Sequence, residues 1–181
     1  MKSALIVVDM LNDFIYGTLR TPEAAAIVPS ARKAIETFRG THNDVIYVSD
    51  SHVGSDVEMK LWGEHAMKGT WGSRIIDDLK PAEGEVVIEK HFYSGFRETG
   101  LNESLSSREI NNLFLLGLDA DICVRHTTAD AFYIGFQTYI VRDAVAARIQ
   151  KDWENYFTVV YGSKIINADQ IGDELERLGK L

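Results

Sequence analysis

The chain contains one cysteine, Cys123, which closely follows the apolar run Leu113–Leu116. A lone thiol has no intramolecular disulfide partner, so it is either a small packing residue or a nucleophile. The thiolate is the reactive form, and a free thiol ionises near a pH of about 8.5. A catalytic Cys123 therefore needs a base or a positive charge beside it.

Two residues of the required types follow other apolar runs. Asp9 comes directly after Leu5–Val8, and Lys90 comes shortly after Val86–Ile88. Asp9 is a candidate base for the thiol proton, and Lys90 is a candidate cation that holds Asp9 and stabilises a thiolate. If Cys123 begins a helix, the unpaired N–H groups of that first turn are candidates for an oxyanion hole. Together these groups suit acyl transfer from an amide, through a thioester, to water. Each residue alone has an ordinary alternative as a turn, surface or packing residue.

A second group of residues has the side chains of a metal site. Asp50 and His52 follow the run Val45–Val48 two positions apart, so an extended chain turns both to the same side. His65 lies in the long, weakly periodic segment 51–78 and completes the set. One aspartate and two histidines with open coordination positions suit Zn²⁺, Fe²⁺ or Mn²⁺. The alternative is that both histidines are ordinary loop residues.

These candidates need a scaffold that brings the ends of several strands together. Short β-branched apolar runs alternate with helical patterns, which is typical of a parallel sheet covered on both faces. In open parallel sheets, ligands bind beyond the carboxyl ends of the strands, where all the candidates fall. We predict strands at 5–8, 45–48, 86–88, 113–116, 138–141 and 164–166, and helices at 22–38 with a break near Pro29, at 121–134 and at 168–178.

Composition limits the classes of function. With 181 residues, 45% of them hydrophobic and 25% charged, the chain fits a single globular domain over residues 1–181. A net charge of −8 argues against nucleic acid as a partner. No apolar run approaches the roughly 18 residues of a membrane span, and the N-terminus does not resemble a signal peptide. With a single cysteine, these features predict a cytoplasmic protein without a membrane partner.

Four ordered motifs resemble those of the isochorismatase-like cysteine hydrolases, a superfamily that includes nicotinamidases and N-carbamoylsarcosine amidases. The resemblance covers about residues 3–145 and implies a doubly wound, three-layer α/β/α fold around a six-stranded parallel sheet. The matching segments are Asp9–Phe14, Trp62–His65 with Gly69-Thr70, Glu89-Lys90 with Tyr93–Phe96, and Gly117–Val124.

The resemblance also implies roles for individual residues. It implies a catalytic triad of Cys123, Asp9 and Lys90. It implies a cis peptide between Leu118 and Asp119, which aims the Asp119 N–H into an oxyanion hole beside the N–H of Cys123.

A metal site and an aromatic pocket follow from the same resemblance. In nicotinamidases the metal receives the ring nitrogen of the substrate, and aromatic side chains sandwich the ring. The expected metal is Zn²⁺, with Fe²⁺ or Mn²⁺ as alternatives. The matching ligands are Asp50, His52 and His65, and the pocket candidates are Phe14, Trp62 and Tyr93.

The chain departs from the family pattern in three places. Leu11 replaces the usual glutamine of the opening motif, and Val53 stands where nicotinamidases commonly have proline. Asp119-Ala120 stands where Ala-Thr is frequent. The first two departures weaken the nicotinamide assignment. We predict a cysteine-dependent amidohydrolase that releases ammonia from a small amide substrate, either nicotinamidase-like or N-carbamoylsarcosine-amidase-like.

Two other classes stay open at this point. An isochorismatase-type hydrolase cleaves a vinyl ether without needing the thiol, and a binding domain on the same fold performs no reaction. Arg97, Arg125 and Arg148 are interpreted as surface salt-bridge residues, with binding of a substrate carboxylate as the alternative. The resemblance implies a homo-oligomer, and the aromatic stretch Trp153–Phe157 is a candidate interface or a core segment.

Overall fold

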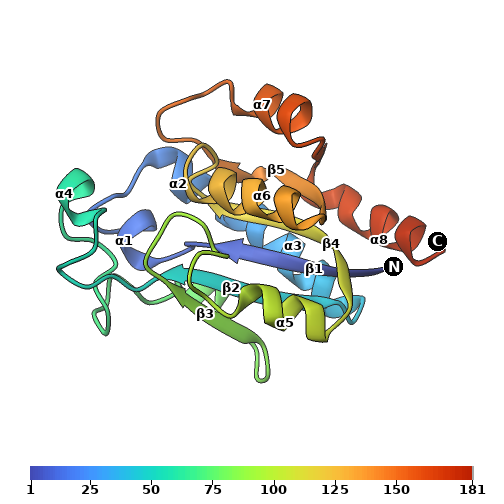
Figure 1. Ribbon diagram of the computed structural model, residues 1–181, viewed down its shortest axis with the longest axis horizontal. Coiled ribbons are helices and arrows are strands. Elements are labelled where there is room, and N and C mark those ends of the chain that lie inside the picture. Colours follow the sequence, from blue (N-terminus) through green and yellow to red (C-terminus); the bar gives the residue numbers. More distant parts are fainter. Residues whose placement is uncertain (181) are drawn as a thin grey trace.

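The computed structural model describes residues 1–180 as a six-stranded sheet with helices on both faces (Figure 1). Every neighbouring pair of strands is parallel, and the spatial order is β3-β2-β1-β4-β5-β6. This confirms the predicted three-layer, doubly wound α/β fold. The strands are β1 (Lys2–Val8), β2 (Asp44–Asp50), β3 (Val86–Lys90), β4 (Ile110–Leu118), β5 (Gln137–Ala146) and β6 (Lys164–Ile166).

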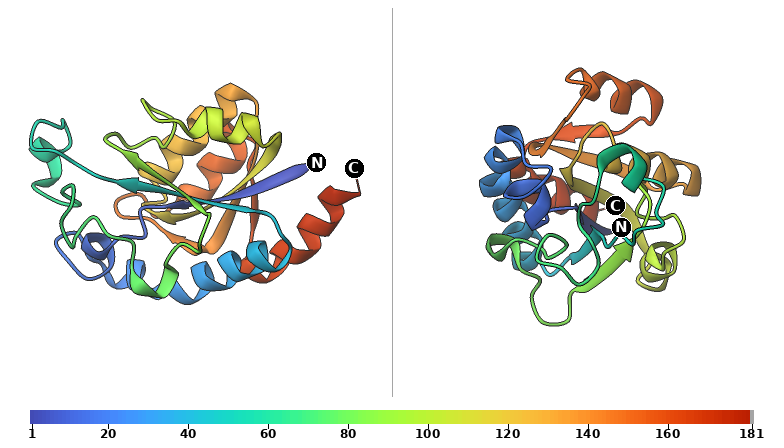
Figure 2. Two further views of the ribbon diagram at one scale, coloured as in Figure 1. Left: turned by 90° about the horizontal axis from the view of Figure 1, so that it is seen from below. Right: turned by 90° about the vertical axis from the view of Figure 1, so that its left-hand side faces the viewer.

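Two of the helices, α3 and α8, cover one face of the sheet, and α5 and α6 cover the other (Figure 2). None of the helices within residues 1–180 combines the length and apolar character needed to cross a bilayer. The helices are α1 (Asn12–Ile15), α2 (Pro22–Ala26), α3 (Val28–Gly40), α4 (Met59–Trp62), α5 (Leu101–Ser107), α6 (Cys123–Ile134), α7 (Trp153–Val160) and α8 (Ile171–Gly179), with single 3₁₀ turns at Asp77–Leu79 and Ala168–Gln170.

The central strand β1 shows why the strands appear as continuous apolar runs. Leu5 and Val7 pack into the core beneath α3 and α8, whereas Ile6 and Val8 pack into the core on the opposite face. Both faces of the sheet are buried, so both sets of alternating side chains must be apolar.

The helical prediction over 22–38 is correct in extent, but its break lies earlier than expected. The structure separates α2 from α3 at Ile27, and Pro29 lies in the first turn of α3. Proline is favoured there because the first N–H groups of a helix have no intrahelical acceptor. Helices α1, α4, α5 and α7 were not predicted.

The carboxyl ends of the strands meet at the edge of the sheet that carries α1 and α4 (Figure 1). Asp50 and Lys90 are the last residues of β2 and β3 and are direct partners in the ladder, so their side chains leave the same face. Asp9 follows β1, and its N–H donates to Val48 O at 3.0 Å, which ties it to the end of β2. The topology therefore places three charged side chains together.

Gly117 is the position in this region that demands glycine. Its φ is 116°, and a Cβ there would lie 1.9 Å from the carbonyl oxygen of Val8. We expect Gly117→Ala to lose at least about 2 kcal/mol of unfolding free energy, because it combines a backbone clash with a strained φ. Denaturant unfolding measures this loss. Gly172→Ala in α8, where nothing lies within 4 Å, is the matched control and should be neutral or slightly stabilising; equal losses in both would contradict the expectation.

Candidate active site

Cys123 is the first residue of α6 and is 4% exposed. The peptide between Leu118 and Asp119 is cis, as the resemblance implied. The N–H groups of Ile122 and Val124 both donate to Asp119 O, at 3.0 and 3.1 Å, which closes the loop before the helix. Within residues 1–180, the N–H groups of Asp119 and Cys123 have no protein acceptor, so two backbone donors beside the thiol are available to a ligand.

Lys90 is fully buried between two carboxylates. Its Nζ lies 2.8 Å from Asp9 Oδ2 and also pairs with Asp50 Oδ1. The N–H of Asp50 donates to Asp9 Oδ1 at 2.7 Å, which fixes the orientation of the Asp9 carboxylate. Cys123 Sγ and one oxygen each of Asp9 and Asp50 lie within 4.8 Å of one another. The structure therefore brings together all three members of the predicted triad.

Burial controls the proton affinities in this group. Burial and the Asp50 charge raise the pKa of Asp9 to about 7, against the opposing effect of Lys90. Burial also raises the pKa of the Cys123 thiol well above its usual value; Lys90 opposes this, and Asp9 adds to it. The thiol is therefore protonated at neutral pH, and a carboxylate with a pKa near neutrality stands beside it. Lys90 was expected to stabilise a thiolate, but two carboxylates already share its charge.

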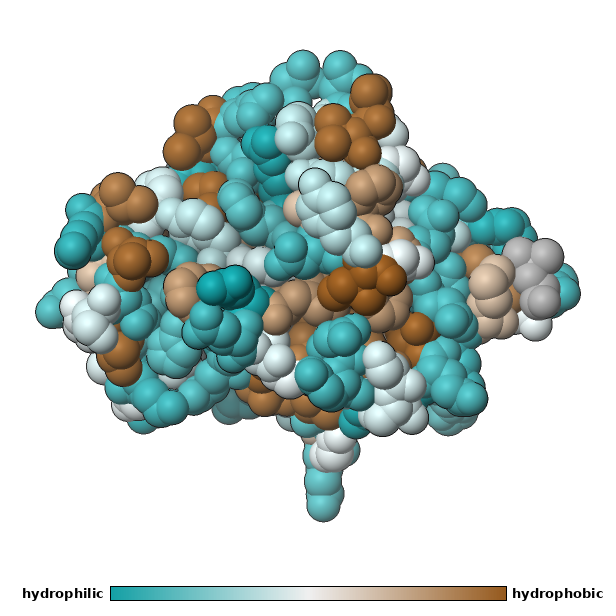
Figure 3. All heavy atoms as spheres, in the orientation of Figure 1, coloured by the Kyte–Doolittle hydropathy of each residue, from teal (hydrophilic) through white to brown (hydrophobic). Residues whose placement is uncertain are grey.

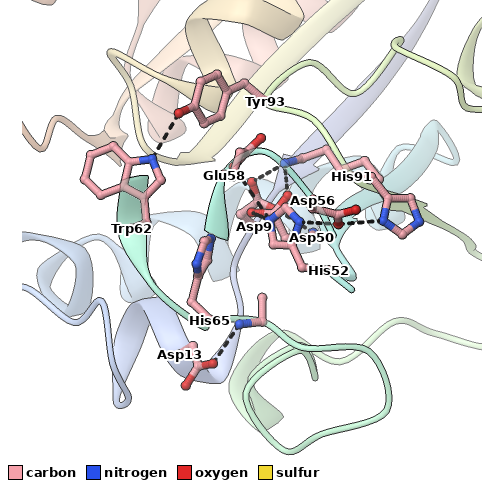
Figure 4. A network of polar contacts seen from close by, with 12 residues as sticks. Asp9, Asp13, Asp50, His52, Asp56, Glu58, Trp62, His65, His91 and Tyr93 are labelled. Carbon is pink, nitrogen blue, oxygen red and sulfur yellow. Dashed lines mark hydrogen bonds and ion pairs between the residues drawn. The ribbon is translucent and has the colours of Figure 1, made fainter. Parts of the chain in front are cut away.

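A second cluster of buried donors lies next to the triad (Figure 4). One ligand atom from each of four side chains lies within 4.8 Å of the others, and the four residues are Asp50, His52, Glu58 and His65. The three predicted metal ligands are thus brought together. Glu58 was missed because it lies in the irregular segment before the four-residue helix α4, where no periodicity or motif marks it. Burial and the Asp50 charge raise the pKa of Glu58 to about 7.

The hydrogen bonds around the two histidines orient them as metal ligands. His52 Nδ1 lies 2.9 Å from Asp56 Oδ2, and His65 Nδ1 lies 2.8 Å from Gly63 O. These acceptors hold a ring proton on Nδ1 and turn Nε2 toward the donor cluster. Against the opposing effect of burial, Asp50 and Asp56 raise the pKa of His52 to about 9, so a cation would compete with a proton for His52 Nε2. Burial lowers the pKa of His65, which favours the neutral ring.

Two buried atoms of this cluster have no hydrogen-bond partner among residues 1–180. They are Asp50 Oδ2 and His52 Nε2, which lie 3.4 Å apart. Unpartnered buried polar atoms are costly and rare in folded proteins. A divalent cation would satisfy both atoms, so the donor set fits a metal site.

A narrow, partly open cavity with a volume of about 10 Å³ lies over the thiol. Trp62 Nε1 donates to the Tyr93 hydroxyl at 3.0 Å, which joins two sides of the cavity (Figure 4). The Phe14 ring meets His65 edge-on, with 5.9 Å between the ring centroids. All three predicted aromatic residues therefore line one cavity together with Cys123. The remaining lining residues are Leu19, Asp50, Glu58, His65, Asp119, Ile122 and Arg148.

The interpretation of Arg148 as a surface residue is wrong. Its side chain is 15% exposed and lines the cavity, where Nε donates to Asp119 Oδ2 at 2.5 Å. Arg148 reaches the cavity because the Asp121 carboxylate accepts the N–H groups of residues 148, 149 and 150. These bonds fold the chain after β5 over the site. Arg97 pairs with its exposed neighbour Glu98, and Arg125 stacks on the Tyr156 ring at 3.7 Å.

The opening motif also fixes the loop that carries His65. Asp13 Oδ2 accepts the N–H of Ala66 at 2.8 Å (Figure 4). Asn12 Nδ2 donates to Trp71 O at 2.9 Å. The loop packs so closely that a Cβ on Gly72 would lie 2.0 Å from Asp13 Oδ2. Asp13 thus positions a metal-ligand candidate without belonging to the donor set, a role that sequence reasoning did not assign.

Comparisons with known proteins match the sequence and fold of this chain. A family model described as "Isochorismatase domain" matches residues 3–170. The solved structure of N-carbamoylsarcosine amidase from Thermoplasma acidophilum is 53% identical, covers 93% of this chain and 98% of its own, and has a TM-score of 0.92. Nicotinamidase PncA from Bacillus subtilis is 32% identical, with 92% and 100% covered and a TM-score of 0.85. Pyrazinamidase from Pyrococcus horikoshii, solved in complex with zinc, is 29% identical, with 92% and 99% covered and a TM-score of 0.84.

Proposed function

The chain belongs to the isochorismatase domain family of hydrolases, and from that premise we propose that it removes the carbamoyl group from a small N-carbamoyl amino acid. The observation that carries this substrate class is Arg148, whose guanidinium lines the same cavity as Cys123. A guanidinium binds a carboxylate through charge-assisted hydrogen bonds. A substrate held by its carboxylate at Arg148 would extend its carbamoyl carbon toward the thiol. The relative from Thermoplasma acidophilum is an N-carbamoylsarcosine amidase, which is consistent with this chemistry.

In the proposed reaction, Asp9 accepts the thiol proton as Cys123 Sγ attacks the carbamoyl carbon. The backbone N–H groups of Asp119 and Cys123 stabilise the oxyanion. Asp9 then returns the proton to the leaving nitrogen, and ammonia departs. Water attacks the resulting S-carbamoyl thioester with Asp9 as the base, and the Cys123 thiol leaves. The released N-carboxy amino acid then loses carbon dioxide, which completes removal of the carbamoyl group. Lys90 stays charged throughout, because two adjacent carboxylates outweigh the effect of burial and raise its pKa.

We further propose that Asp50, His52 and His65 hold a divalent cation, with Glu58 as an additional oxygen donor. Zn²⁺ suits this mixture of nitrogen and oxygen donors, and Fe²⁺ and Mn²⁺ are the alternatives. A cation bound there would polarise and orient a polar atom of the substrate beside Cys123.

Asp13 gives a test of the metal proposal that does not depend on turnover. We expect Asp13→Ala to weaken Zn²⁺ binding by about 10- to 100-fold, because Ala66 loses its acceptor and His65 loses its fixed position. Competition with a chromogenic chelator measures this affinity. Asp13→Asn keeps an acceptor oxygen and should recover most of it. Unchanged Zn²⁺ affinity in Asp13→Ala would contradict the assigned role.

Nicotinamide is the second candidate substrate. It is favoured by the donor cluster and by the aromatic cavity walls of Phe14 and Trp62. Convergence of Asp9 and Lys90 on the thiol supports either amidase over a vinyl-ether hydrolase or a binding domain, which need no such group.

Ammonia release separates the two candidates. Purified protein would be assayed with N-carbamoylsarcosine, N-carbamoylglycine, nicotinamide and pyrazinamide. We expect the highest kcat/KM with an N-carbamoyl amino acid. A higher value with nicotinamide would replace the first proposal with the second, and no ammonia from any of the four would overturn both.

We also propose that the chain self-associates through the ends of α6 and α7. Exposed apolar side chains gather there, and the Phe132 ring at the end of α6 lies 6.0 Å from the Tyr161 ring after α7. Figure 3 shows that apolar patches on the face it presents are separated by hydrophilic surface. Trp153 and Phe157 are buried in the fold, so they belong to the core. The exposed apolar residues are Phe132, Tyr133, Ile134, Val159 and Val160.

Light scattering after gel filtration tests this proposal. We expect a dimer or larger species, and we expect the double variant Val159→Glu, Val160→Glu to lower the mass. Val87→Glu, which places a charge on the exposed strand at the far edge of the sheet, is the control and should leave the mass unchanged. A monomeric wild-type protein would overturn the proposal.

A further inference from the structure

The cavity over Cys123 contains an acidic side chain, Asp119, where the family pattern frequently has alanine. Asp119 is 4% exposed, and its carboxylate pairs with Arg148 through both oxygens, at 2.5 Å to Nε and 3.5 Å to Nη2. Nη2 also donates to Leu19 O at 2.8 Å. Within residues 1–180, Nη1 is the guanidinium nitrogen left without a protein acceptor.

The position of the guanidinium is fixed from its backbone outward. The Asp121 carboxylate accepts the Arg148 N–H at 2.9 Å and the next two N–H groups at 2.7 Å each. Asp119 and Leu19 then hold the tip of the side chain. Arg148 therefore meets a ligand with one free nitrogen rather than the two-nitrogen fork that binds a carboxylate most strongly.

The charges that line the cavity determine how the Asp119–Arg148 pair affects the binding of an anionic substrate. Arg148 is the one lysine or arginine that lines the cavity within residues 1–180, whereas three carboxyl side chains line it: Asp50, Glu58 and Asp119. The Asp119 carboxylate pairs directly with the Arg148 guanidinium. An anionic substrate therefore approaches a cation that is already neutralised, in surroundings where charges are poorly screened.

We propose that Asp119 is a specificity-determining residue that weakens the enzyme's selectivity for anionic substrates and admits neutral amides to the same cavity. The inference rests on the proposed function and adds a residue to it: Arg148 attracts the substrate carboxylate, and Asp119 limits that attraction. Removing the Asp119 charge while keeping its shape should turn the enzyme toward carboxylate-bearing substrates.

The test measures binding in the Cys123→Ala protein, so that it does not require turnover. Calorimetry at pH 8 would compare N-carbamoylsarcosine with 1-ethyl-1-methylurea, in which a methyl group replaces the carboxylate. We expect Asp119→Asn in this background to bind N-carbamoylsarcosine about tenfold more tightly and to change the Kd for the urea less than twofold. Asp119→Glu keeps the charge and should retain the parental ratio of the two Kd values. A merely structural role of Asp119 would not predict that the ratio follows the charge.

Asp152→Asn is the matched control, because it removes one exposed negative charge that does not line this cavity. It should leave both Kd values unchanged. An unchanged ratio in Asp119→Asn, or failure of the Asp119→Asn protein to bind the anion, would overturn the inference. The ratio could instead change while the protein with Cys123 intact releases no ammonia from N-carbamoyl amino acids. That result would overturn the proposed function and leave the role of Asp119 standing.

Discussion

Replacing Cys123 by alanine is expected to lower kcat/KM for ammonia release by at least about 10⁴-fold. The side chain supplies the nucleophile, and no other thiol exists in the chain to replace it. Removing a single sulfur atom should change stability little, by about 1 kcal/mol.

Intact-mass spectrometry after rapid acid quenching gives the decisive measurement. The wild-type protein should accumulate an acyl adduct on Cys123 during turnover, and the alanine variant should show none. Cys123→Ser is the conservative control; its hydroxyl is far less acidic than the thiol, so we expect it to lose nearly as much activity. Activity near the wild-type value in Cys123→Ala would eliminate nucleophilic catalysis by this residue.

Asp9→Asn is expected to lower kcat/KM by about 10³- to 10⁴-fold, because asparagine cannot accept the thiol proton. The pH dependence gives a second signature. Burial raises the pKa of Asp9 to about 7, and the base works only when it is ionised. Wild-type kcat/KM should therefore rise as the pH increases through about 7, and this acid limb should be missing from the residual activity of Asp9→Asn.

Thermal unfolding controls for damage to the fold. The pKa of Asp9 is higher in the folded protein than its ordinary value of 3.8, so folding favours the protonated carboxyl. Its ionisation lowers stability as the pH rises from about 4 through about 7. A neutral asparagine should therefore not lower the Tm at pH 8. A large fall in Tm, or an acid limb that persists in the variant, would contradict the assignment of Asp9 as the base.

Much of the fold could be predicted because short stretches of the sequence specify its strands. Each buried strand is a short apolar run, and the predicted runs lie inside the observed strands. The strands extend further at their polar ends, as at Asp50 and Lys90, because the backbone ladder continues whatever the side chains are. Helix α5 was missed because it has only seven residues, with Leu101 and Leu105 as its buried positions.

The same difference between local and long-range information separates the residues of the candidate site. Asp9, Lys90 and Cys123 were found because each stands at or just beyond a strand end, and strand ends converge in this topology. Glu58 was missed, and Arg148 was given only as an alternative carboxylate binder among three arginines, because nothing local marks either residue. Arg148 enters the cavity only through contacts with Asp119 and Asp121, which are more than 25 positions earlier in the chain. Such contacts arise from tertiary structure and have no sequence period.

The sharing of Lys90 by Asp9 and Asp50 makes the catalytic base and the proposed metal site thermodynamically reciprocal. The Lys90 ammonium pairs with Asp9 of the proposed triad and with Asp50 of the proposed metal site. A positive charge added beside Asp50 would therefore leave Lys90 more available to Asp9. A bound cation should then make Asp9 more acidic, and ionisation of Asp9 must strengthen cation binding by the same factor. Proton uptake by Asp9 and cation binding at the proposed metal site would therefore be two coupled equilibria, linked through Lys90.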